Sequence, residues 1–277
     1  MKPGTHCKSG LAAAVSALAI LAAFAALFMG CAFGGNASDH AAPMQILHAP
    51  RLGLVMSGSA TISWDTSQPV AGRVEWGTSP AYDRVLPEAR PATHHHVTLA
   101  GLSPGTTYHF RIVADRAGVG DCTLTTAPPP GVDFSFASLA DNRGTSIPAD
   151  LVALPRAFLD IMARIRDKAP SFVLHGGDLF YGSPVLAEQA RMYEVFKSAT
   201  DAVAARIPFL VSPGNHEMDL VTGQFDSLVL FGSQFGQPAI LPGYEGTIYS
   251  WDWGNSHFAS VDSCHYDPAR PSNGMYY

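Results

Sequence analysis

Three apolar segments of this chain each end in residue types that bind metal ions. Asp141 follows a segment that begins near Phe134, Asp178 follows Phe172–Gly177, and Asn215 follows Pro208–Gly214. The two intervals between these polar residues are both about 37 residues, the length of one strand–helix–strand unit. Because parallel crossovers share one hand, successive strands bring their carboxyl ends to one sheet edge, so we expect the three side chains to converge.

Clustered carboxylates repel one another unless cations neutralise them. Asp141, Asp178 and Asn215 therefore indicate hard metal ions, and one shared carboxylate suits a two-metal site. Gly177 and Gly214, placed directly before two of these residues, allow the backbone to turn sharply off each strand. The pattern therefore favours a metal site at this edge of the sheet.

The segments that must position these residues alternate between strand and helix patterns. This alternation predicts an α/β domain that occupies 132–277. Two later β-like segments are expected to pair as a hairpin around Gly254 and to extend the sheet. The expected strands and helices, in chain order, are Phe134–Leu139, Leu151–Lys168, Phe172–His175, Ala187–Ala205, Pro208–Ser212, Thr247–Trp253 and His257–Val261.

An all-β domain is expected before this one, at 46–127. Short alternating segments separated by Pro and Gly turns predict a β-sandwich, and the stiff segment Pro128–Gly131 predicts the domain linker. The segment Leu99–Tyr108 resembles a strand–turn–strand signature of fibronectin type III-like domains, in which the tyrosine pins a loop to the core. His94–His96 is interpreted as surface polarity, since neighbouring strand residues face opposite sides.

Two signatures in the second domain resemble those of the calcineurin-like metallophosphoesterases. They are Gly177-Asp178-Leu179-Phe180-Tyr181 and Gly214-Asn215-His216-Glu217. Many members carry a histidine two residues after the first aspartate, where this chain has Arg143. With Tyr181 three residues after Asp178, this combination is similar to the purple acid phosphatases. The first signature departs from the usual one, because Asp141-Asn142-Arg143-Gly144 is one residue longer between Asp and Gly.

The resemblance implies a fold, a metal centre and an activity. The fold would be a fibronectin type III-like sandwich followed by an αββα metallophosphoesterase domain. Asp141 and Tyr181 would bind Fe(III), Asp178 would bridge, and Asn215 would bind a second ion, Fe(II), Zn(II) or Mn(II). His216 would meet the substrate, a small phosphate ester, which a metal-activated hydroxide would attack in line at phosphorus, as in an acid phosphatase. A phosphodiesterase or nucleotidase of the same superfamily, or a catalytically inactive cell-surface binding protein, remains the alternative.

The same resemblance raises the question of completeness. The family uses three further histidines from later signatures, and the chain ends at Tyr277 before them. His265 lacks the glycine-flanked partner expected of a ligand. We therefore expect a sequence truncated within the metallophosphoesterase domain, with weak metal loading and no appreciable activity of its own.

Residues 1–30 have the pattern of an export signal. Lys2 and Lys8 precede an uncharged, Ala- and Leu-rich segment, Leu11–Met29, although a transmembrane anchor of this length is the alternative. Cys31 resembles the lipid-modified cysteine of bacterial lipoproteins, so a lipid anchor is the one membrane contact expected. The predicted location is periplasmic, envelope-anchored or extracellular. In that oxidising setting Cys122 and Cys264 either pair or stay as thiols.

The net charge of -6, spread over scattered acids and bases, argues against a nucleic-acid partner, which would require a basic stripe. The composition leaves the oligomeric state open.

Overall fold

The computed structural model describes residues 43–143, 154–183, 185–217, 224–237, 244 and 246–262. The predicted export signal, Cys31, Cys264 and His265 lie outside this part of the chain. The described residues belong to one compact unit. Within the described ranges, no helix combines the length and apolar character that crossing a bilayer would need.

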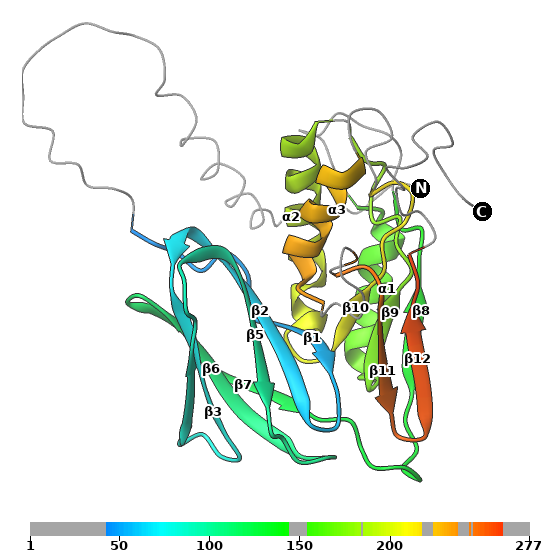
Figure 1. Cartoon of the computed structure of the whole chain (residues 1–277). Helices are drawn as coiled ribbons and strands as arrows, with labels where there is room; N and C mark the ends of the chain where they lie inside the picture. The colour runs from blue at the N-terminus through cyan, green and yellow to red at the C-terminus, as the bar shows by residue number, and fades with distance from the viewer. Residues whose placement is uncertain are drawn as a thin grey trace, which may run out of the picture. The chain divides into compact units, whose positions relative to one another are not determined.

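The first part of the described chain is a β-sandwich, as the alternating patterns predicted. A three-stranded sheet has the order β1-β2-β5, and a four-stranded sheet has the order β4-β3-β6-β7 (Figure 1). The bounds are β1 Arg51–Val55, β2 Ser59–Val70, β3 Gly72–Gly77, β4 Arg84–Pro87, β5 Ala92–Ala100, β6 Thr107–Ala114 and β7 Ala117–Thr125. On β6 the apolar side chains Tyr108, Phe110 and Ile112 are buried, and the polar residues between them are more exposed. This two-residue period places one face of the strand in the core.

The tyrosine contact expected at the turn before β6 is present. Tyr108 is 5% exposed, and its hydroxyl accepts a hydrogen bond of 2.9 Å from the backbone N–H of Ser103. The side chain therefore fixes the loop between β5 and β6 to the core of the sandwich.

The second part of the described chain is built on a parallel sheet of order β10-β9-β8. Its strands are β8 Phe136–Leu139, β9 Phe172–His175 and β10 Phe209–Val211, and its helices are α1 Arg156–Lys168, α2 Leu186–Ala204 and α3 Gln224–Phe235. Within β9, Val173 belongs to an apolar cluster with the three helices, whereas Phe172 belongs to a cluster that includes Trp251 and Trp253. The strand is therefore covered on both faces, as parallel strands usually are.

The predicted hairpin forms, but the prediction that it extends the sheet was wrong. The strands β11 Tyr249–Trp253 and β12 Ser256–Ser260 pair with each other as a separate two-stranded sheet. Phe172 of β9 packs edge to face against Trp251 and Phe258, with ring centroids 6.1 and 5.1 Å apart. These aromatic side chains pack the hairpin against the face of the parallel sheet. A hairpin that extended the sheet would instead pair along its edge and would not make these contacts. Figure 1 shows the hairpin on the side of β8–β10 opposite the helices.

The interpretation of His94–His96 as surface polarity was also wrong. His95 is fully buried, stacks on Trp64 at a centroid distance of 4.7 Å, and contacts Glu88 Oε2 and Thr66 Oγ1 through its two ring nitrogens. On the opposite face of β5, His96 Nε2 donates to the carbonyl of Ser233 in α3 at 2.8 Å. The alternation itself was predicted correctly, but both faces of this strand are covered.

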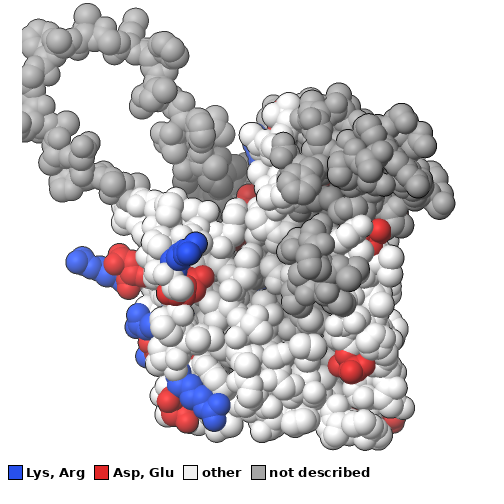
Figure 2. Space-filling view, in the orientation of Figure 1, with Lys and Arg blue, Asp and Glu red and all other residues white. Residues whose placement is uncertain are grey.

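On the face shown in Figure 2, lysine and arginine side chains lie beside aspartate and glutamate side chains, mainly over the sandwich. The described surface in this view therefore shows no stripe of one charge.

Candidate metal and phosphate site

The turns that follow β8 and β9 lie against each other at the carboxyl edge of the parallel sheet. Leu139 pairs with His175 at the ends of the two strands, and beyond that pair the backbone N–H of Asp141 donates to the carbonyl of Gly177 at 3.1 Å. The N–H of Ser212, just after β10, donates to the carbonyl of His175 at 2.8 Å. All three strand ends therefore meet at this edge, as the sequence spacing predicted.

Two of the predicted ligands have unusual backbone conformations. Asp141 and Asp178 have φ values of 56° and 57°, in the left-handed region where aspartate is tolerated better than most residues. Gly177 also has a positive φ, and a Cβ on it would collide with the backbone of Pro213 and Gly214. The close approach predicted for the turn before Asp178 is therefore present, and left-handed residues of this kind concentrate at functional sites.

Arg143 contacts the two predicted aspartate ligands. Its Nη1 donates to Asp178 Oδ2 at 2.6 Å, and its Nη2 lies 3.6 Å from Asp141 Oδ1. The guanidinium carbon also lies 5.8 Å from the ring centre of Tyr181. The sequence identified Arg143 as a departure from the histidine of many relatives, but it did not predict this ion pair.

Tyr181 and His216 complete the group. Their rings pack edge to face with centroids 5.4 Å apart. The Nδ1 of His216 donates to the carbonyl of Tyr181 at 2.8 Å, and the backbone N–H of His216 donates to Asp178 Oδ1 at 3.2 Å. Asn215 occupies the same turn, next to His216, and is partly buried. The structure thus brings the turn that carries Asn215 close to Asp178 and Tyr181.

The donor set fits hard cations. Asp141, Asp178, Tyr181 and Asn215 all offer oxygen atoms, which bind iron(III), manganese(II) and related ions well. The positive guanidinium of Arg143 beside two carboxylates shows that this edge already accommodates a cationic group. Asp178 is 7% exposed, so a cation at its carboxylate would be partly shielded from water.

Glu217 is the main residue of the site whose role the sequence did not reveal. Its side chain is fully buried and its carboxylate accepts backbone hydrogen bonds from Gly214, Asp178 and Leu179. Burial raises the pKa of Glu217 to about 7, although the three backbone hydrogen bonds act in the opposite direction. A glutamate three residues after the first residue of a turn can reach back to that residue's N–H, as in a capping box. The three-residue spacing between Gly214 and Glu217 is therefore the sequence feature that could have indicated this role.

His175 belongs to the core, as the sequence indicated for a strand-end residue. It is 1% exposed and packs among the rings of Phe158, Phe196 and Phe209. Burial lowers its pKa to about 4, against the attraction of Asp141. This histidine is therefore neutral near pH 7.

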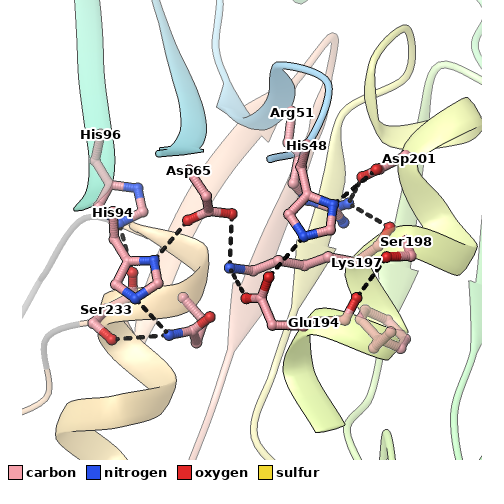
Figure 3. Close-up of polar contacts among 12 residues, drawn as sticks. His48, Arg51, Asp65, His94, His96, Glu194, Lys197, Ser198, Asp201 and Ser233 are labelled. Carbon is pink, nitrogen blue, oxygen red and sulfur yellow. Dashed lines mark hydrogen bonds and ion pairs between the residues drawn. The ribbon is translucent and has the colours of Figure 1, made fainter. Parts of the chain in front are cut away.

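A second cluster of potential ligands lies where α2 contacts the sandwich. His48, Asp65 and Glu194 place ligand atoms within 4.8 Å of one another. Lys197 occupies this position instead: its ammonium donates to Asp65 Oδ2 at 2.9 Å and to Glu194 Oε1 at 3.3 Å (Figure 3). The carboxylates already face a buried cation, so the cluster is an ion-pair network between the sandwich and α2.

A cavity of about 530 Å³ lies at the other edge of the sheet. It is lined by residues that precede the strands, including Phe134, Ser171 and Pro208, and by Thr125 of the sandwich. The aspartates that follow β8 and β9 lie at the opposite ends of these strands, so this cavity does not belong to the candidate site.

Comparison with known proteins identifies both parts of the chain. Residues 48–126 match the purple acid phosphatase N-terminal domain, and residues 149–267 match the calcineurin-like phosphoesterase family. The chain is 30% identical over 244 residues to acid phosphatase type 7 of Mus musculus, covering 83% of this chain and 51% of that protein. The human protein of the same name is 28% identical over 220 residues, covering 74% of this chain and 46% of that protein. The chain thus spans about half the length of these curated relatives.

Solved structures show the same fold. The purple acid phosphatase PPD1 from yellow lupin (Lupinus luteus) seeds superposes with a TM-score of 0.58 at 18% identity, covering 78% of this chain and 46% of that one. A structure of PhoD gives the same TM-score at 14% identity, covering 78% of this chain and 52% of that one. The chain therefore combines a purple acid phosphatase N-terminal domain with a calcineurin-like phosphoesterase domain, in the fold of the solved purple acid phosphatase.

Proposed function

We propose that this protein hydrolyses small phosphate esters at a dinuclear metal centre, in the manner of an acid phosphatase. The observation that carries the proposal is the convergence of Asp141, Asp178 and Tyr181 with the turn of Asn215 and His216 at one sheet edge. The match of residues 149–267 to the calcineurin-like phosphoesterases and the similarity to acid phosphatase type 7 support phosphoester hydrolysis as the reaction class.

The proposed centre would hold Fe(III) through Asp141 and Tyr181, with Asp178 shared between the ions. Asn215 would bind Fe(II), Zn(II) or Mn(II). When bound, two such ions polarise the ester oxygens and lower the pKa of a water for in-line attack on phosphorus. Arg143 retains further N–H donors besides the one directed at Asp178, and these can bind phosphate oxygens.

His216 is the proposed catalytic residue. Because its Nδ1 donates to the carbonyl of Tyr181, the ring orientation is fixed and Nε2 remains available. A protonated Nε2 would donate to the leaving oxygen of the ester, and general acid assistance of this kind contributes roughly 10²–10⁴-fold. We also propose export of the protein, with Cys31 as the candidate for lipidation.

The direct test uses protein expressed from the complete gene and loaded with iron and zinc or manganese. We expect metal-dependent hydrolysis of p-nitrophenyl phosphate that is lost on chelation, together with a purple absorbance band from the tyrosine. Faster hydrolysis of bis(p-nitrophenyl) phosphate would instead favour a phosphodiesterase. A protein that binds both metals but hydrolyses neither ester would contradict the proposal and favour the binding-protein alternative.

A further inference from the structure

Glu217 connects the two turns that carry the proposed metal ligands. Its Oε2 accepts from the backbone N–H groups of Gly214 at 2.6 Å and Asp178 at 2.8 Å, and its Oε1 accepts from Leu179 at 2.7 Å. Gly214 belongs to the turn after β10, whereas Asp178 and Leu179 belong to the turn after β9. One fully buried side chain therefore ties the backbones of both turns together.

These hydrogen bonds lie beyond the last residues at which β9 and β10 pair with each other. The pairing of β9 with β10 ends at His175 and Val211, and the last backbone bond between them near this edge joins Ser212 to His175. Among the described residues, the other bonds between the two turns involve His216, and one of them uses the carboxylate of Asp178 itself. Glu217 holds the turns through backbone atoms, so it leaves that carboxylate available.

The backbone of Glu217 is itself fixed from α2. Gln189 is fully buried, and its Nε2 donates to the carbonyl of Glu217 at 2.5 Å. The glutamate is thus held at both its main chain and its carboxylate. A side chain fixed in this way can define a distance between two turns, whereas a flexible one could not.

We propose that Glu217 is a positioning residue for the metal pair: it sets the separation of Asp178 and Asn215 without contacting either ion. The inference rests on the proposed function, because it concerns the same two ligands. Residues that orient metal ligands typically change metal affinity by roughly 10–100-fold when replaced.

The test is the Glu217→Gln variant of the protein expressed from the complete gene. The amide keeps the shape but replaces one accepting oxygen with an NH₂ group that faces backbone N–H donors. We expect Mn(II) affinity, measured by titration calorimetry, to fall about tenfold or more. The visible band of the iron-loaded protein should also shift, since Tyr181 follows Asp178 by three residues.

The matched control is Asp65→Asn, which removes a carboxylate of similar burial. That carboxylate accepts a hydrogen bond from Lys197 and contacts His94, away from the sheet edge that carries the proposed metal ligands. It should lower the free energy of unfolding but leave Mn(II) affinity within about twofold of wild type. Equal losses of Mn(II) affinity in both variants, or no loss in Glu217→Gln, would overturn the positioning role. If Glu217→Gln does not fold, Gln189→Met should weaken Mn(II) binding in the same direction, and unchanged affinity there overturns the inference. A wild-type protein that binds no metal would instead refute the proposed function.

Discussion

Lys197 of α2 and Asp65 of β2 form a buried ion pair of 2.9 Å between the two parts of the molecule. The lysine is fully buried and the aspartate is 5% exposed. Burial disfavours the charged carboxylate, but hydrogen bonds from His94 and Lys197 outweigh it and hold the pKa of Asp65 far below its usual range. Arg51 and His48 of the sandwich add contacts with Asp201 of the same helix (Figure 3).

Removing the cation from this network should destabilise the protein strongly. The Lys197→Met variant leaves Asp65 buried opposite an apolar group, and breaking such a pair costs about 3–5 kcal/mol. Chemical denaturation would measure the loss of unfolding free energy. Lys168→Met, at the exposed end of α1, should change it by no more than about 0.5 kcal/mol. The double variant with Asp65→Asn should recover part of the loss, and strictly additive effects would contradict the pairing.

The network should weaken in alkaline solution. Burial disfavours the charged form of His48, but hydrogen bonds to Asp201 and Glu194 outweigh it and raise the pKa of His48 to about 9. Because the pKa is higher in the folded protein, protonated His48 stabilises the fold. This contribution is fully present below pH 6.5, the ordinary pKa of histidine, and disappears as the pH rises through about 9. We expect a loss of about 1–2 kcal/mol over this window, allowing for the partial exposure of both carboxylates. The measurement is denaturant unfolding at a series of pH values.

The His48→Gln variant provides the control for this pH dependence. It should be less stable than wild type at pH 6, and its stability should vary less between pH 6.5 and 9. An alkaline decline of the same size in both proteins would show that other groups are responsible.

Replacing His216 should reduce turnover more than metal binding. The His216→Asn variant keeps a polar group but loses the acid at Nε2, so kcat for p-nitrophenyl phosphate should fall roughly 10²–10⁴-fold. Metal content by elemental analysis should stay unchanged. His257→Asn, which alters an exposed histidine on the hairpin, should retain wild-type kcat. A His216 variant that retains turnover would exclude the acid role.

Replacing Tyr181 with phenylalanine should remove the visible absorbance of the iron-loaded protein. The tyrosine is 44% exposed, so the unfolding free energy should change by no more than about 0.5 kcal/mol. The measurement is the absorption spectrum at matched iron content. Tyr82→Phe, a change on the sandwich, should leave the band in place, and a band that survives Tyr181→Phe would remove this residue from the ligand set.

The local patterns predicted much of the fold because each depends on neighbouring residues. The apolar segments of β8, β9 and β10 and the amphipathic helices α1 and α2 lie close to their expected positions. The short edge strand β4, with four exposed residues, has no buried face and therefore no alternation to detect. The hairpin was placed correctly, but its layer was not, because aromatic packing against Phe172 is not visible in a strand pattern.

The sequence by itself supplied the candidate site: a family resemblance pointed to Tyr181 and His216, and local patterns placed Asp141, Asp178 and Asn215 after successive strands. This was possible because strand–turn geometry and parallel topology follow from local periodicity and glycine placement. Only the tertiary structure decided which distant groups meet. Lys197 lies 132 residues from Asp65 and Glu217 lies 39 from Asp178. Such pairings depend on how whole elements pack, and no spacing along the chain encodes them.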